Sequence, residues 1–350
     1  MCGFRAPFFS HGAFLLMSSE RPKRMETRYK IGVSKRALWN RARIAVLCFA
    51  APLCLLQARA QSAAPAGKPS GSLHLTDETG RAVAVPQPVR RIVSLAPNLT
   101  ETLFAIGAGN LIVGDTDYCD YPPEAKAKAH VGGPVNPSLE RVAALHPDLV
   151  LATRAINRRE TVVSLENLGI AVYASDPRTV DQVLTSIERL ASLIGASATA
   201  QGVTADLRSR LANIRSRLAG IEPKTVLFIT WEDPLITVGS NTFLADALRI
   251  AGARSVIEMK EDWPNVSLEE VARLQPEYLI FATDEPEQFQ RDLRELEGRA
   301  GWRDLDALKS GRVVLLPESI DRPAPRLVDA IEQLARTLHP DRFATSGGAL

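Results

Sequence analysis

The chain has 350 residues, of which 45% are hydrophobic, 23% charged and 6% aromatic. These proportions are globular and exclude a disordered, collagen-like or fibrous chain. At about 100 to 200 residues per domain, the length allows two lobes with separate cores. The first 60 residues hold 11 Lys and Arg against 2 Asp and Glu, which leaves 31 basic and 38 acidic residues, a net charge of −7, in the rest. An acidic body excludes a nucleic-acid partner, which requires a basic domain.

The N-terminal segment has the pattern of an export signal. A basic stretch over 35–43 precedes the apolar run Ile44–Leu56, and small residues follow up to Ala60. The run of 13 residues is shorter than the ~20 that span a bilayer, but it has the length of a signal peptide's apolar segment. We expect cleavage after Ala60 and a periplasmic mature protein, with Met25 as an alternative start. A lipid anchor at Cys54 is the less favoured alternative.

The mature chain keeps one of the four cysteines, Cys119. A single thiol cannot form an internal disulfide, so the exported fold depends on its hydrophobic cores. No His lies near Cys119 in the sequence to act as a base, and we interpret this residue as a spectator thiol.

Secondary-structure signals appear in a regular order. The segment Leu73–Val85 alternates apolar and polar residues around a central turn, which predicts a hairpin. The strand Ile92–Leu95 follows, and Asn98 with Glu101 predicts a capping box for a helix that ends near Gly107. Alternation of short strands and helices continues down the chain and predicts an α/β fold with mainly parallel sheets.

An internal repeat divides the chain into two related halves. The ten residues 138–147 match 267–276 at seven positions, and an acidic residue and an apolar strand follow both segments. Upstream, Leu103, Gly107, Ala108 and Ile112 match residues 145 positions later in the same order. Shared helix punctuation alone explains three or four matches, so the clustering favours two Rossmann-like lobes with a ligand cleft between them.

A helical segment lies between the halves. Residues Val180–Leu218 are helical in pattern, with an interruption near Gly195. Apolar residues at 207, 211, 214 and 218 form a stripe along Ser197–Leu218, and a helix of this length spans about 33 Å. We expect a long interlobe backbone helix that limits hinge bending and keeps the cleft largely pre-formed.

These signals predict a set of boundaries. They are an N-terminal extension and signal peptide at 1–60, a linker at 61–71, an N-terminal lobe at 72–179, a helical backbone at 180–220, a C-terminal lobe at 221–343 and a tail at 344–350.

Catalytic and cofactor motifs are absent from the sequence. The segment Gly107–Gly109 closes a helix rather than opening one, so it does not fit a dinucleotide-binding motif. The sequence has no metal-binding His or Cys spacing and no nucleophile motif, so we expect no metal, no resident cofactor and no catalysis. Asp115, Asp117 and Asp120 are predicted to form a solvated acidic loop, with a cation site as the less favoured alternative.

Scarce aromatic residues follow the predicted strands. Tyr118 and Trp231 come after strands, and Trp263 lies in the loop before the second repeat helix. Ligands of α/β sheets bind beyond the carboxyl ends of strands, where such rings offer broad faces to a large flat ligand. Packing under a loop is the alternative for Trp231 and Trp263, and Trp302 is predicted to pack in a core.

Glu140 and Glu269 occupy equivalent positions in the first turns of the two repeat helices. The helix dipole favours an acid at either place. If a pseudo-two-fold axis relates the lobes, the pair also presents two matched acidic knobs to a two-fold partner. We therefore predict that they dock onto basic pockets of a dimeric membrane protein.

Several segments resemble the substrate-binding proteins of ABC importers with a helical interlobe backbone, a group that handles iron chelates, haem and cobalamin. The resemblance covers about 90–343, and the motifs that carry it are 91–101, 118–123, 139–141, 147–150, 263–267 and 325–326. The Tyr-x-Asp-Tyr-Pro-Pro and Trp-Pro-x-Val-Ser motifs are similar to those of the cobalamin branch.

This resemblance implies a monomeric periplasmic protein that captures a corrinoid and delivers it to a dimeric inner-membrane ABC permease. It places Tyr118 and Trp263 against the corrinoid, with Trp231 near another aromatic position, and Glu140 and Glu269 against permease arginines. Asn98, Pro134 and Arg322 complete the predicted ligand contacts. Pro134 and Thr153 stand where relatives carry Trp, so a ferric siderophore or haem is the alternative ligand, with Arg322 and Arg326 as the candidate cations. An exported enzyme that uses the same cleft is a further alternative.

Overall fold

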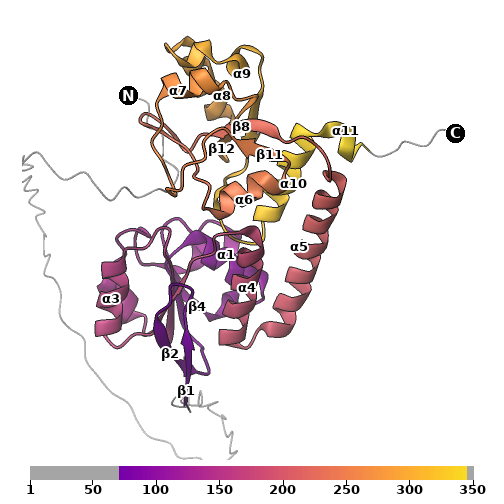
Figure 1. The fold of residues 1–350 in the computed structure, drawn as a ribbon. Helices are drawn as coiled ribbons and strands as arrows, with labels where there is room; N and C mark the ends of the chain where they lie inside the picture. Colours follow the sequence, from indigo (N-terminus) through magenta and orange to yellow (C-terminus); the bar gives the residue numbers. More distant parts are fainter. Residues whose placement is uncertain (1–70, 345–350) are drawn as a thin grey trace, which may run out of the picture. The chain divides into compact units, whose positions relative to one another are not determined.

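A computed structural model of the protein describes residues 71–344 (Figure 1). The predicted signal peptide, the lipid-anchor alternative, most of the predicted linker and the C-terminal tail lie outside these residues. No helix within 71–344 combines the length and apolar character needed to cross a membrane.

The N-terminal lobe is built on a five-stranded parallel sheet with the strand order β5-β4-β3-β6-β7. Its elements alternate as the sequence predicts. The strands are β3 (Ile92–Ser94), β4 (Ile112–Asp115), β5 (Ala129–His130), β6 (Leu149–Thr153) and β7 (Val172–Ser175), and the helices are α1 (Pro97–Ala105), α2 (Leu139–Ala144) and α3 (Arg159–Asn167), with 3₁₀ turns at Gly109–Leu111 and Pro123–Ala127.

The predicted hairpin precedes this sheet. Strands β1 (Gly71–Thr76) and β2 (Ala82–Gln87) pair antiparallel. The buried Asp77 carboxylate closes the turn by accepting hydrogen bonds from the backbone N–H groups of Thr79 and Arg81. Glu78 then accepts a hydrogen bond from the backbone N–H of Asp176, which fixes the hairpin tip at the end of β7.

The C-terminal lobe contains a four-stranded parallel sheet with the order β11-β8-β12-β13 and a short hairpin, β9 with β10. The strands are β8 (Lys224–Phe228), β9 (Trp231–Glu232), β10 (Leu235–Ile236), β11 (Ala253–Ser255), β12 (Tyr278–Ala282) and β13 (Val313–Leu316). The helices are α6 (Phe243–Ile250), α7 (Leu268–Leu274), α8 (Pro286–Gly298), α9 (Asp306–Lys309), α10 (Leu327–Leu338) and α11 (Pro340–Phe343), with 3₁₀ turns at Trp302–Asp304 and Glu318–Asp321.

The capping box predicted for the first helix is wrong. Helix α1 begins at Pro97, its N-cap is Ala96, and no side chain caps it. Proline is favoured in the first turn because it has no N–H to leave unpaired. Asn98 therefore lies inside the first turn and is buried, and Glu101 is free to contact the other lobe. The predicted end is confirmed, since Gly107 follows the helix with φ of 77°.

The two lobes repeat the same local hydrogen bonds. Ser138 caps α2 by accepting from the N–H of Arg141, and Ser267 caps α7 by accepting from the N–H of Glu270. The acidic residue that follows each repeat also has one role. Asp148 accepts hydrogen bonds from the backbone N–H groups of Arg90 and Arg91 before β3, and Glu277 accepts from Thr225 in β8.

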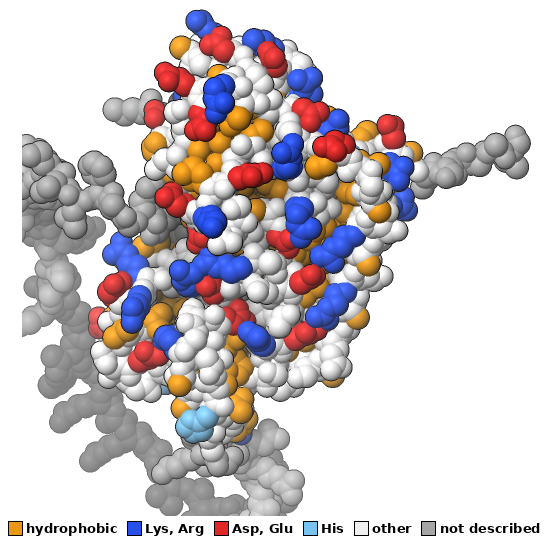
Figure 2. All heavy atoms as spheres, viewed as in Figure 1, with side chains coloured by type: hydrophobic (Ala, Val, Ile, Leu, Met, Phe, Trp, Pro, Cys, Tyr) orange, Lys and Arg blue, Asp and Glu red, His pale blue; other side chains and the backbone are white. Residues whose placement is uncertain are grey.

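The helical segment between the lobes consists of two packed helices rather than one interrupted rod. Helix α4 (Val180–Ile194) ends at Gly195, which has φ of 75°, and α5 (Ser197–Arg217) packs back along it. Among the helices of 71–344, α5 alone runs from one lobe to the other (Figure 1), and its 21 residues span about 31 Å. Figure 2 shows basic and acidic side chains alternating over the face that carries α5, where Arg208, Arg210 and Arg215 form ion pairs.

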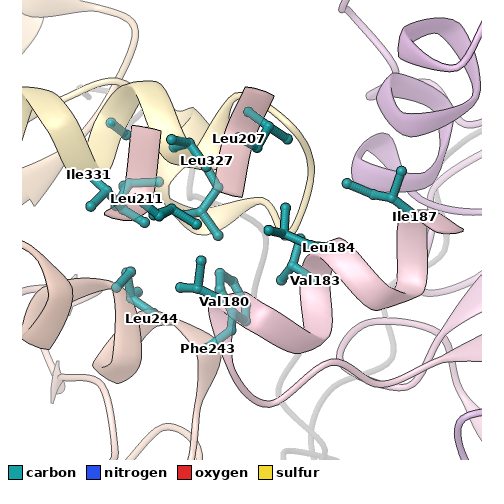
Figure 3. Packing of buried hydrophobic residues seen from close by; sticks show 14 of the residues in the cluster. Val180, Val183, Leu184, Ile187, Leu207, Leu211, Phe243, Leu244, Leu327 and Ile331 are labelled. Atoms are coloured by element: carbon teal, nitrogen blue, oxygen red, sulfur yellow. The ribbon is translucent and has the colours of Figure 1, made fainter. Parts of the chain in front are cut away.

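A continuous hydrophobic cluster joins the lobes beside this connector. Leu207 and Leu211 of α5 pack with residues of α4, α6 and α10 (Figure 3). The same cluster includes Ile92 of the first sheet and Val226 of the second. Because protein cores are densely packed, a shared core resists rotation of one lobe against the other. This arrangement supports the expectation of a stiff connection, through packing as well as through a helix.

Candidate ligand-binding site

The lobes contact each other through segments that follow the carboxyl ends of their strands. Asp120, which follows β4, contacts Arg322, which follows β13, and Nη1 of the arginine lies 2.8 Å from Oδ1 of the carboxylate. Burial alone would raise the pKa of Asp120, but the Arg322 guanidinium outweighs it and holds the pKa below its usual value. In α/β sheets ligands bind at this carboxyl edge.

A second ion pair connects the lobes through different strands. Arg178 follows β7 and places Nη1 2.9 and 2.8 Å from the two carboxylate oxygens of Asp262, which follows β11. Arg178 also contacts Asp176, whose own pKa is raised by burial. Asp262 precedes Trp263 directly, so this pair lies next to one of the predicted ligand residues.

A third pair is more deeply buried. Arg326, at the start of α10, places Nη2 2.7 Å from Oε2 of Glu101 in α1, whose side chain is only 2% exposed. The Arg326 guanidinium also lies 3.6 Å from the centre of the Tyr121 ring. A charged pair with a stacked aromatic face is well suited to a partly buried position. These contacts fix the loop that carries Tyr118, Asp120 and Tyr121 against the C-terminal lobe.

Tyr118 is exposed to 48% and follows β4 as predicted. Its ring lies beside Gly133, at which an added Cβ would meet the tyrosine ring at 3.9 Å. A large exposed ring at the carboxyl edge of the sheet is available as a contact surface for a ligand.

Trp263 is partly buried and packs against the cluster shared by both lobes. Its loop is fixed by backbone hydrogen bonds, because Gly239 and Thr237 donate to the carbonyl oxygens of Asp262 and Pro264. A Cβ at Gly239 would lie 1.6 Å from the Glu261 carbonyl oxygen, so only glycine permits this approach. Trp263 therefore packs in part as core, and its contact with a ligand stays a prediction.

The other two tryptophans of the described chain differ in burial. Trp231 is half-buried in β9, and its indole N–H donates to the Asp233 carbonyl oxygen at 2.7 Å within the same hairpin. Only its ring face is therefore available to a ligand. Trp302 is 4% exposed and packs in the second core of the C-terminal lobe, which confirms the predicted packing role.

Asn98 and Pro134 are both buried. The Pro134 carbonyl oxygen accepts a hydrogen bond from Asn157, whose amide also donates to Leu95 and accepts from the N–H of Thr153. Asn157 thus connects three loops at the carboxyl edge of the N-terminal sheet. Sequence reasoning did not identify this residue, since a single Asn after a strand is an ordinary loop signal.

Carboxylates surround Arg322 on its own lobe as well. Glu318 lies 3.5 Å from Nη2 of Arg322, and burial raises the pKa of this glutamate. Burial, with a contribution from Glu318, also raises the pKa of Asp321 to about 7, and its Oδ1 has no hydrogen-bond partner among the described residues. Both arginines that sequence reasoning proposed for an anionic ligand, Arg322 and Arg326, are therefore already paired with carboxylates.

The predicted solvated acidic loop is only partly correct. Asp117 is exposed, but Asp115 is fully buried beside His130, and Asp120 is in the interlobe ion pair described above. Asp115 is the last residue of β4, and its side chain is buried at the end of this strand. No group of acidic, His or Cys side chains within 71–344 has the arrangement of a metal site. Cys119 is buried, and burial raises the pKa of its thiol to about 11, so it is protonated at neutral pH.

Glu140 and Glu269 are both exposed in the first turns of α2 and α7.

Two surface depressions, of about 410 and 460 Å³, contain none of the predicted ligand residues. One lies along α10 and the other beside Phe104 and Lys128.

A family model described as periplasmic binding protein matches residues 92–320. The two lobes with parallel sheets, the bridging helix and the matched repeat helices agree with this match. The chain belongs to this family. Its members are substrate-binding proteins that work with an ABC permease.

Two relatives of this family are similar to the chain over most of its length. The chain is 30% identical over 262 residues to the vitamin B12-binding protein of Vibrio cholerae serotype O1, covering 73% of this chain and 91% of that protein. It is 30% identical over 277 residues to an uncharacterised ABC transporter substrate-binding lipoprotein of Bacillus subtilis, covering 77% and 86%.

Solved structures of the family have the same fold. The crystal structure of the periplasmic vitamin B12-binding protein of Vibrio cholerae matches with a TM-score of 0.64 and 28% identity, over 74% of this chain and 99% of that one. The periplasmic haem-binding protein of Roseiflexus sp. RS-1 matches with a TM-score of 0.64 and 25% identity, over 73% and 99%. These similarities confirm the predicted two-lobed α/β fold.

Proposed function

We propose that the protein is a periplasmic binding protein that captures a corrinoid, cobalamin in particular, and delivers it to an inner-membrane ABC importer. The similarity to vitamin B12-binding proteins over most of the chain supports this ligand. In this proposal the predicted signal peptide exports the chain and is cleaved, and the mature protein acts as a monomer whose N-terminal lobe at 72–179 and C-terminal lobe at 221–343 are joined by the helical backbone at 180–220.

The pairing of the interlobe arginines is the observation that carries the choice of ligand. Haem and most ferric siderophores present carboxylates or other anionic groups, and a pocket for them requires a cation that is free to pair. Arg322 contacts Asp120 and Glu318, and Arg326 contacts Glu101 and the Tyr121 ring. A ligand whose periphery is mainly neutral amides does not require these arginines to leave their partners.

The proposed contacts follow from the positions of the side chains. Tyr118 and Trp263 supply ring faces from the two lobes, and Trp231 supplies a third from its hairpin. Arg322, with its 16% exposed side chain, lies at the side of the site and donates to the ligand only through the nitrogen atoms that its carboxylates leave unused. Asn98 and Pro134 are buried, so their role in this proposal is to shape the first turn of α1 and the loop after β5.

The proposed partner contacts are the acidic residues of the repeat helices. Glu140 and Glu269 are exposed at equivalent positions, as two-fold recognition requires. We propose that each pairs with basic residues on one subunit of a dimeric permease. Catalysis has no part in this proposal, and the ligand leaves unaltered.

A ligand panel tests the proposal. Purified protein is incubated separately with cyanocobalamin, haem and a ferric siderophore, passed through a desalting column and scanned for absorption. We expect the corrinoid spectrum alone to elute with the protein, and acid denaturation to release the corrinoid unchanged. Retention of haem and not of cyanocobalamin would contradict the proposal and favour the haem alternative, which the fold shared with a haem-binding protein supports.

A further inference from the structure

Asp115 and His130 are the last residues of adjacent strands in the N-terminal sheet. Strands β4 and β5 pair in parallel, and the register places these two residues opposite each other. The chain after Asp115 forms the loop with Tyr118, and the chain after His130 leads to Pro134. Both segments proposed to contact the ligand from this side therefore leave the sheet at one pair of residues.

The two side chains contact each other at this point. Nδ1 of His130 lies 2.9 Å from Oδ1 of Asp115, whose side chain is completely buried, whereas the His130 side chain is 37% exposed. Oδ2 of Asp115 has no hydrogen-bond partner among the described residues. A buried carboxylate with a single partner depends strongly on that partner for its orientation. His130 is therefore the more exposed member of the pair.

Other charged groups affect the pKa of Asp115 less than burial and His130 do. The Lys128 ammonium favours the charged carboxylate, and Asp117 opposes it. The Cys119 thiol also faces Asp115 and accepts a hydrogen bond from the Thr100 hydroxyl at 3.1 Å. Burial is the main effect and raises the pKa of Asp115 to about 6, with His130 partly offsetting it.

Backbone hydrogen bonds connect the two loops to each other just beyond this pair. The N–H of Val131 donates to the Asp115 carbonyl oxygen at 2.8 Å, and the N–H of Asp117 donates to Gly132 at 3.1 Å. Farther along the first loop, Asp120 and Tyr121 contact Arg322 and Arg326 of the other lobe. The geometry of the strand ends thus determines where the Tyr118 ring and the interlobe contacts lie.

We propose that Asp115 and His130 are positioning residues for the ligand site, holding the loop of Tyr118 and the segment 131–134 in the arrangement that binds the ligand. Their effect on ligand affinity rests on the proposed function, but their effect on the loops does not. Neither side chain contacts the ligand in this proposal. Because the ordered arrangement buries Asp115 and raises its pKa, the protonated carboxyl favours that arrangement, and its deprotonation loosens both loops and lowers affinity.

Three variants separate positioning from general stability. Asp115→Ala removes the acceptor, and Asp115→Asn keeps a hydrogen-bond acceptor that does not titrate. Asp148→Asn is the matched control, because Asp148 binds backbone N–H groups at the opposite, amino edge of the same sheet. Amide hydrogen exchange of the ligand-free full chain at about pH 8 is the first measurement, and it needs no ligand.

We expect Asp115→Ala to lose about tenfold in protection at the amides of Asp117 and Val131, the order expected for a charge-assisted hydrogen bond. Asp115→Asn and Asp148→Asn should retain protection at these two amides. Equal protection in Asp115→Ala and wild type, or the same local loss in Asp148→Asn, would overturn the positioning role. This result stands whether or not a corrinoid binds.

The affinity for cyanocobalamin between about pH 5 and about pH 8 is the second measurement. Wild-type affinity should fall as the pH is raised through about 6, where the buried Asp115 carboxyl loses its proton. Asp115→Asn should bind within about threefold of wild type at the lower pH and show no such fall. An identical pH profile in wild type and Asp115→Asn would reject the pH dependence, whereas a wild type that binds no corrinoid would reject the proposed function instead.

Discussion

His146 and Gln275, at equivalent positions of the two repeats, both have a backbone φ of 44°. All other residues of 71–344 with positive φ are glycines. Each follows its repeat helix and precedes a proline and the next strand. The left-handed conformation costs an L-residue about 1 kcal/mol or more, so both lobes retain the same unfavourable turn. The repeat seen in the sequence therefore extends to the backbone geometry.

Replacing His146 with glycine should remove this strain. We expect His146→Gly to raise the free energy of unfolding by about 0.5 to 1 kcal/mol, measured by urea denaturation. Gln275→Gly should gain less, because the Gln275 side chain also accepts a hydrogen bond from the N–H of Asp306 at 2.9 Å. A clear loss of stability in His146→Gly would show that the turn is not strained.

The buried interlobe ion pair should matter more to stability than the exposed one. We expect Glu101→Gln to lower the free energy of unfolding by about 3 kcal/mol, because it leaves the Arg326 charge without its partner. The matched control is Asp262→Asn, which breaks a half-exposed pair and should cost under about 1 kcal/mol. Equal costs in urea denaturation would contradict the assignment of Glu101 and Arg326 as the fixed contact between the lobes.

Asp321 should make stability depend on pH. Folding raises its pKa from 3.8 to about 7, so the folded state holds the proton more tightly than the unfolded chain. Its contribution to stability is complete below pH 3.8 and is lost as the pH rises through about 7. The neutral variant Asp321→Asn should therefore match wild type at about pH 4 and be more stable at about pH 8. Thermal unfolding across this range measures the difference.

A second variant checks the cause of that shift. Glu318 also raises the pKa of Asp321, after burial. Glu318→Gln should move the loss of stability to lower pH, and an unchanged profile would show that the two carboxyl groups do not interact.

Reversing the charge of both Glu140 and Glu269 should abolish binding to the importer without changing ligand affinity. The reason is that both side chains are exposed in the first turns of α2 and α7. Binding is measured with detergent-solubilised vitamin B12 importer on a surface that carries the protein. Glu160→Lys is the matched control, as another exposed acid in a helix first turn. Unchanged importer binding by the double reversal would refute the docking proposal.

Local and repetitive features of this protein could be predicted from its sequence. The hairpin, the alternation of strands and helices, the repeat and the bridging helix depend on short-range patterns or on comparison of one half with the other. The capping-box prediction failed for a local reason. The helix begins at Pro97, so Asn98 lies inside the first turn and is buried instead of capping the helix. The packing of α4 against α5 was also missed, since one glycine can either kink a helix or reverse the chain.

The interlobe contacts could not be predicted, because they join distant residues. Arg178 and Asp262 are 84 positions apart, Asp120 and Arg322 are 202 apart, and Glu101 and Arg326 are 225 apart. No periodicity relates such residues, and an arginine paired with a carboxylate looks the same in sequence as a free one. Burial of Asp115 was missed for a similar reason, since acidic residues after a strand are usually solvated.

The central claim is that rings from both lobes hold a corrinoid, and a calorimetric titration of Tyr118→Ala, Trp263→Ala and their double variant with cyanocobalamin tests it most directly. We predict that wild type binds, that each single variant loses at least about 1 kcal/mol of binding free energy, and that the double variant loses more. Leu168→Ala, at an exposed apolar residue after α3, serves as the control and should bind as wild type does. Wild-type affinity in the double variant would contradict the account.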